Sequence, residues 1–129
     1  MNQLPISKYF VSLRKILLQN KSIKKMLDES LEAIHEKDGQ FYKGTLRGRQ
    51  VLESEQSIVI IGDIEEGATV ASKGNVIVTG TIYGTVIAGA SGRRDAVIAA
   101  LRMQPKKLRI GEVKVKPVIG GSYSWAKLS

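Results

Sequence analysis

Cysteine is absent from this chain of 129 residues, and the sequence holds only one histidine, one tryptophan and three prolines. The missing thiols exclude disulfides, thiolate metal sites and cysteine nucleophiles. Aromatic residues make up 5% of the chain, which leaves no visible platform for stacking nucleic-acid bases. No apolar run approaches the roughly 20 residues needed to cross a bilayer, and Arg14 and Lys15 interrupt the N-terminal apolar stretch. These absences predict a cytoplasmic protein.

What the chain has is glycine and positive charge. Thirteen glycines indicate many tight turns, and 43% hydrophobic residues indicate a folded domain rather than a disordered chain. The net charge of +8 favours anionic partners, which include nucleic acid, anionic lipid and acidic protein segments.

The N-terminal residues 1–39 form a segment of their own, which we expect to be helical over residues 7–38 and to end at Gly39. Its apolar residues recur at steps of three and four, as one helix face requires: Tyr9, Leu13, Ile16, Leu17, Ile23, Leu27, Leu31 and Ile34. Its first half is basic and its second half acidic. Such a helix can meet an anionic membrane or an acidic peptide, or it can pack on its own domain.

From Gly44 onward the period changes to six. The aliphatic residues at this spacing are Leu46, Leu52, Ile58, Ile64, Val70, Val76 and Ile82. Gly44, Gly62 and Gly80 recur at three times this step, and Ser54 and Ser72 keep the same longer interval. Short β-branched segments bounded by glycine are typical of strands, and a fixed repeat of short strands is typical of a solenoid.

The repeat predicts a mainly β protein with a triangular β-helix, a single-stranded solenoid in which each coil has about three short strands. We assign the β-helix to residues 40–119 and a C-terminal tail to residues 120–129. The charged residues expected to point outward are Arg47, Arg49, Glu53, Glu55, Glu65, Glu66 and Lys73. Residues 84–90 predict a shortened coil, residues 91–95 a loop, and the alanine-rich residues 97–103 a strand rather than a helix. The helical segment and the tail, in which Trp125 has no obvious partner, are candidate caps for the open ends.

The order of these motifs resembles the C-terminal domain of MinC, the inhibitor of bacterial cell division, over about residues 41–112. The resemblance is carried by residues 42–50, where the family shows an Arg-Ser-Gly-Gln signature, and by residues 74–84, 88–92 and 100–111. It implies a right-handed β-helix without enzymatic activity that forms a homodimer through one face. It also implies binding to MinD, a membrane-associated ATPase, and inhibition of assembly of the tubulin-like protein FtsZ. The protein would then reach the inner face of the membrane only indirectly, through MinD.

By position, the resemblance places partner binding on Arg47, Gly48, Arg49 and Gln50, with Asp95 as a further contact. An arginine offers a bidentate fork to a carboxylate, glutamine offers a donor and an acceptor, and glycine allows close backbone approach. The sequence departs from the family at Arg49, which replaces a glycine, and at Arg93, where some members carry an acid. The family also has a larger N-terminal domain than the residues that precede the repeat here.

Three other functions are compatible with parts of the pattern. Hexapeptide acyltransferases share the six-residue step but use a histidine base, and the only histidine here is His35, outside the repeat. Bactofilins are self-assembling β-helix scaffolds, but their coils continue with few interruptions. Nucleic-acid binding is suggested by the charge alone. No cofactor or metal site is expected, because the sequence has no metal-spaced histidine cluster and no phosphate-binding loop.

Overall fold

The computed structural model describes residues 3–5 and 40–128, and all regular structure in this part of the chain is β. The strands are β1 (Gln3–Pro5), β2 (Gln40–Lys43), β3 (Val51–Ser54), β4 (Ile58–Ile61), β5 (Thr69–Ser72), β6 (Val76–Ile82), β7 (Thr85–Ala88), β8 (Val97–Met103), β9 (Lys107–Ile110), β10 (Val113–Lys114), β11 (Val118–Ile119) and β12 (Ser124–Lys127). The helix predicted over residues 7–38, with His35 in it, lies outside the described residues.

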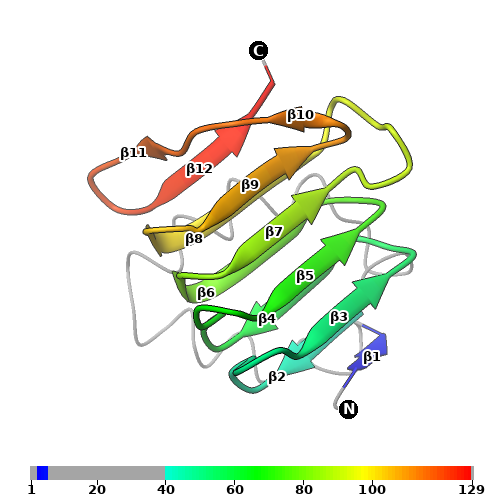
Figure 1. Ribbon diagram of the computed structural model, residues 1–129, viewed down its shortest axis with the longest axis vertical. Coiled ribbons are helices and arrows are strands. Elements are labelled where there is room, and N and C mark those ends of the chain that lie inside the picture. Colours follow the sequence, from blue (N-terminus) through cyan, green and yellow to red (C-terminus); the bar gives the residue numbers. More distant parts are fainter. Residues whose placement is uncertain (1–2, 6–39, 129) are drawn as a thin grey trace.

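The strands stack into a solenoid with two sheets and a third, narrower face (Figure 1). We call the seven-stranded sheet, with order β1-β2-β4-β6-β8-β12-β11, sheet A, and the five-stranded sheet, with order β10-β9-β7-β5-β3, sheet B. The third face is marked by parallel bridges from Leu46 to Ile64 and from Ile64 to Ile82. The predicted β-helix is therefore confirmed for the described residues, while its right-handed sense stays a prediction.

The coil length is constant at first and then changes. Ile58 pairs with Gln40 and Val76 with Ile58, so these coils have equal length, three times the six-residue step. Thr85 pairs with Thr69, which makes the next coil shorter and confirms the predicted shortening. The coil from Thr85 to Lys107 is then longer than any before it, because it includes the loop before β8. The alanine-rich stretch is strand β8, as predicted.

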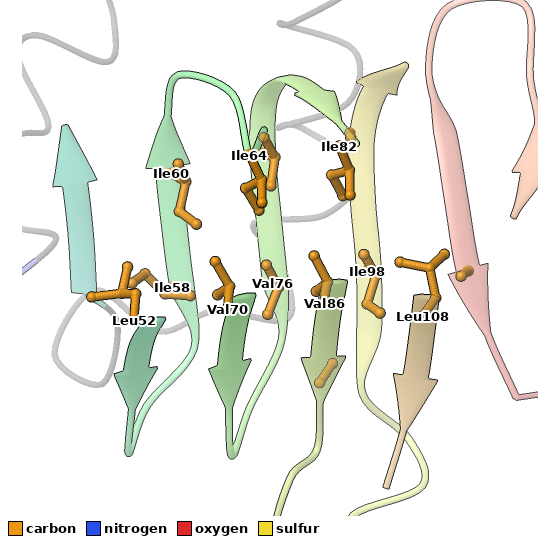
Figure 2. Close-up of a cluster of buried hydrophobic side chains, with 14 of the residues drawn as sticks. Leu52, Ile58, Ile60, Ile64, Val70, Val76, Ile82, Val86, Ile98 and Leu108 are labelled. Atoms are coloured by element: carbon orange, nitrogen blue, oxygen red, sulfur yellow. The ribbon is translucent and has the colours of Figure 1, made fainter. Parts of the chain in front are cut away.

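Inward side chains form aliphatic ladders that run through the stack (Figure 2). The ladder of sheet B consists of Leu52, Val70, Val86 and Leu108, and the ladder of the third face consists of Leu46, Ile64, Ile82 and Met103. All seven aliphatic positions of the six-residue repeat are buried, and all seven predicted outward charges are exposed. Because apolar burial is worth about 25 cal/mol per Å², these ladders are the main favourable term for the fold.

Sheet A is apolar on both sides, unlike sheet B. Its outward row of Phe41, Val59, Ile77 and Ala99 is also buried, with 0–1% exposure. This explains why β4 and β6 read as continuous β-branched runs, since parallel sheets covered on both faces lack polar alternation. Two glycines allow the coils to approach closely: a Cβ at Gly62 would lie 2.3 Å from the carbonyl oxygen of Gly44, and one at Gly80 2.6 Å from that of Gly62.

Antiparallel strands close both ends of the stack. β1 pairs with β2 at the first coil, while β12 pairs with β8 and β10 pairs with β9 at the last. Val115 and Leu128 pack against the core cluster, so the tail covers the end of the hydrophobic core. Trp125 does have a partner, because its ring centroid lies 5.5 Å from that of Tyr123.

Candidate functional site

The Arg47 corner (residues 47–50) joins the third face to sheet B in the first coil. Its backbone forms a tight turn, in which the amide of Gln50 donates to the carbonyl of Arg47 at 3.1 Å. The Gln50 side chain closes the same turn, since its Oε1 accepts a hydrogen bond from the Arg47 amide at 2.8 Å. Gln50 therefore holds the corner in shape, and its exposed side chain can still offer its NH₂ group and the second lone pair of Oε1 to a partner.

The Arg47 corner and the equivalent turn of the next coil each contain one glycine, but the glycine of the corner comes one residue earlier in its turn. Gly48 has φ +58° at the first central position of its turn, whereas Gly67, the counterpart of Arg49 in the next coil, has φ +91° at the second central position. Positive φ at the first position is the pattern of a type II′ turn, and at the second the pattern of type II. The turn therefore tolerates arginine where the family has glycine at position 49. Gly48 has the positive φ that the turn requires, and Arg49 has a negative φ.

The Arg47 side chain is 72% exposed and only loosely paired. Its Nε lies 3.7 Å from Oε1 of Glu65, whose own side chain is 47% exposed. Exposed ion pairs of this kind are worth about 0–1 kcal/mol, so a carboxylate of a partner can replace Glu65 at little cost. The side chain of Arg49 is also exposed, and a Cβ at Gly48 would meet nothing within 4 Å. The corner therefore presents two guanidinium groups beside open backbone.

Tyr83 extends this surface and was missed by the sequence analysis. It lies in the column of Arg47 and Glu65, because the bridges at Leu46, Ile64 and Ile82 place the residues after them side by side. Its side chain is 43% exposed, and exposed tyrosines are enriched at protein interfaces. Tyr83 follows Glu65 by the same coil interval that separates Glu65 from Arg47, so the sequence repeat could have identified it as part of this surface.

Asp95 does not join the Arg47 corner within one chain. Asp95 lies in the loop after the C-terminal end of β7, whereas the corner comes just before the N-terminal end of β3. Because β3 and β7 run parallel, these two places lie at opposite strand ends of sheet B. Asp95 is engaged locally, since Nε of Arg93 donates a hydrogen bond to its Oδ1. This hydrogen bond, with the positive charge of Arg93, lowers the pKa of Asp95 below its ordinary value, although partial desolvation opposes the shift.

A shallow polar hollow of about 450 Å³ lies along the same edge as Asp95. It is lined by Glu53, Ser54, Glu55, Ala71, Lys73 and Ala90. Lys73 and Glu55 form an ion pair across it, with 2.6 Å between Nζ and Oε2. Lys73 is therefore already paired within the hollow, and Glu53 leaves its lining with a net negative charge, unlike the Arg47 corner.

Among the described residues, no three His, Cys, Asp or Glu side chains are grouped closely enough to hold a metal ion. The same residues contain no helix of the length and apolarity that a bilayer-spanning segment needs. What the Arg47 corner offers chemically is a preformed cationic surface for a carboxylate or phosphate group.

Comparison with known proteins assigns the β-helix. Residues 40–118 match the family model described as the C-terminal domain of the septum formation inhibitor MinC. A probable septum site-determining protein MinC of Agathobacter rectalis is 46% identical over 77 residues, which cover 60% of this chain and 32% of the relative. The corresponding protein of Clostridium novyi is 40% identical over 96 residues, which cover 74% of this chain and 46% of the relative. The chain thus spans between about a third and a half of these relatives.

A solved structure shows the same fold. It is a chain of the MinC:MinD cell division protein complex of Aquifex aeolicus, with a TM-score of 0.62 and 36% sequence identity. The similarity covers 69% of this chain and 76% of that chain.

Proposed function

Since this chain belongs to the family of MinC C-terminal domains, we propose that it is a non-enzymatic adaptor that binds a MinD-like ATPase through the Arg47 corner and regulates septum placement. The observation that carries the proposal is the exposed guanidinium of Arg47 on a turn that Gln50 holds closed. The similarity to a chain from a MinC:MinD complex supports the choice of partner.

In this proposal each corner residue has a distinct role in docking. Arg47 exchanges its weak contact with Glu65 for a bidentate pair with a carboxylate of the ATPase. Gln50 is a positioning residue, because its side chain fixes the turn. Arg49 adds a second cation, and Tyr83 provides an apolar ring on the same surface. ATP binding and hydrolysis belong to the partner.

We further propose that the protein is cytoplasmic, forms a homodimer and is recruited to the inner face of the membrane by its partner. There it antagonises FtsZ assembly, as the family resemblance implies. Asp95 contributes to partner binding only if the dimer or the bound ATPase bridges the two edges of sheet B. FtsZ pelleting in the presence of the chain and ATP-loaded partner measures the antagonism, which predicts less polymer in the pellet.

A pull-down with the ATP-loaded partner, in the absence of lipid, tests the docking. Arg47→Glu reverses the charge at the corner without touching the core, and it should reduce capture at least tenfold through repulsion of the partner's carboxylate, a loss of about 1.4 kcal/mol or more. Lys114→Glu is the matched control, because it makes the same charge change on exposed β10 in the last coil. Undiminished capture by Arg47→Glu would remove the corner from the proposal.

A further inference from the structure

Positive charge is concentrated at the C-terminal end of the solenoid. Residues 91–128 contain nine lysines and arginines against two acids, whereas residues 40–90 contain four against five. Both sheets end in this region, with β10 at the edge of sheet B and β11 at the edge of sheet A (Figure 1). Within residues 40–128 the first coils are therefore nearly neutral and the C-terminal end is strongly basic, and this basic end attracts anionic surfaces.

The cap segment (residues 113–119) crosses this end and has two different sides. Val113, Val115 and Pro117 are half-buried, and Val115 packs against the core cluster. The alternate residues Lys114, Lys116 and Val118 are exposed, and Ile119 follows with 68% exposure. One side of the segment thus closes the core, while the other presents two lysines followed by two apolar residues.

The fold gains nothing from these cations. Lys114 lies directly opposite Arg109 on the neighbouring strand β9, and like charges in that position are destabilising. Neither Lys114 nor Lys116 takes part in the ion pairs of the described part of the chain that involve Arg47, Lys73 and Arg93. The charge of both lysines is therefore available to an external anion.

We propose that the cap segment contacts an anionic lipid surface once the MinD-like partner has brought the protein there. This rests on the proposed function for recruitment and adds a second, direct contact. Lysines beside exposed aliphatic residues suit the bilayer interface, where the charges meet phosphates and the apolar side chains enter the boundary region. Nucleic acid fits less well, because Val118 and Ile119 would be left against a phosphate backbone and no exposed base-stacking platform accompanies the lysines.

The contact is weak by itself and gains from the partner. Each lysine near an anionic surface contributes about a fivefold increase in partitioning, and the two together roughly thirtyfold at low salt. Tethering through the partner raises the effective concentration of the cap segment at the membrane, so a weak contact becomes useful.

Vesicle binding by the full chain tests the proposal. Trp125 is the only tryptophan and pairs across the strands with Val118, so its emission reports on this end of the molecule. We expect a blue shift with phosphatidylcholine vesicles that contain about one third phosphatidylserine, with little change on pure phosphatidylcholine, and a loss of binding as salt rises. Lys114→Gln/Lys116→Gln should weaken binding roughly thirtyfold.

Arg47→Gln/Arg49→Gln is the matched control, because it removes the same charge at the other end. It should keep vesicle binding but lose capture of the MinD-like partner, while the lysine double variant should do the opposite. This pattern separates the two proposals, since either contact can fail alone. Equal binding to neutral vesicles, undiminished binding by the lysine double variant, or tighter lysine-dependent binding to duplex DNA than to the anionic vesicles would overturn the lipid assignment.

Discussion

The first coils and the last coils of the solenoid differ in regularity. Up to Ile82 the paired residues keep one constant interval, and the inward positions hold large aliphatic side chains. Beyond it one coil is shorter and the next is longer, and the ladders continue through smaller or more flexible residues such as Ala100 and Met103. The inward rungs stay aligned in both regions. The difference shows that only the inward ladder residues must stay opposite one another, while the corners between strands can vary in length and charge.

The largest expected effect is on the regular coils. Ile64 is 0% exposed in the middle of the third-face ladder, so Ile64→Ala should lower the free energy of unfolding by about 4 kcal/mol, because the two neighbouring coils prevent collapse of the cavity. Met103→Ala, at the end of the same ladder, should cost about 2 kcal/mol, because Met103 is flexible and already 6% exposed. Urea unfolding measures both, and equal losses would contradict the contrast between the two regions.

Asn75 tests the junction where the coil lengthens. It is 2% exposed, and its Oδ1 accepts a hydrogen bond from the Val97 amide at 2.8 Å, which anchors the start of β8 after the loop. Asn75→Ala should cost about 1–2 kcal/mol by leaving that partly buried amide without a partner. Asn75→Asp keeps the acceptor oxygen but buries a carboxylate, so it should also lose stability while the Val97 amide stays protected from exchange. Faster hydrogen exchange at Val97 in the alanine variant would locate the loss.

Gly48 gives a smaller effect at the Arg47 corner. Because its φ is +58° and its surroundings are open, Gly48→Ala should cost about 1 kcal/mol from backbone strain alone. Gly48→Asn should cost less, since asparagine tolerates the left-handed region. Gly67→Ala should cost more than Gly48→Ala, because its Cβ would lie 2.6 Å from the carbonyl oxygen of Gly48. Thermal unfolding of the three variants gives this ranking, and a Gly48→Ala protein as unstable as Gly67→Ala would refute it.

The smallest expected effect is on the stability of the protein at low pH. The folded pKa of Asp95 is lowered mainly by its hydrogen bond with Arg93, so its contribution to stability is present above the unfolded pKa. It is lost as the pH falls through the lowered folded pKa, in the range below about 4. The pair is exposed, so Asp95→Asn should barely change stability at neutral pH and should slightly flatten the acid limb. A pH titration of unfolding for both proteins measures the difference.

Much of the described fold follows from the repeat. The six-residue interval identified the buried ladder residues, because inward positions of stacked strands must be apolar. The β-branched runs identified β4 and β6, because β-branched residues favour strands. The interval also located the shortened coil. It did not predict that β12 joins sheet A beside β8, because antiparallel pairing of a tail depends on the shape of the end it covers.

The candidate site was predicted less completely. Exposure of Arg47 and Arg49 follows from their outward register, and the structure places both on one corner. The hydrogen bond that the Gln50 side chain accepts from the Arg47 amide depends on turn geometry, which the sequence does not specify. The resemblance placed Asp95 with the Arg47 corner as a further contact, and it did not predict that parallel strands put the two at opposite strand ends of sheet B.

The loop between β7 and β8 shows where the molecule tolerates insertion. On both sides of it the strands remain in register, with Val76 opposite Ile98 and Val86 opposite Leu108, although the coil has lengthened. A foreign peptide inserted after Ser91 would extend from this exposed loop into solvent and would not pass between coils. This position is therefore suited to carrying an epitope or a small fluorescent reporter for following the protein in living cells.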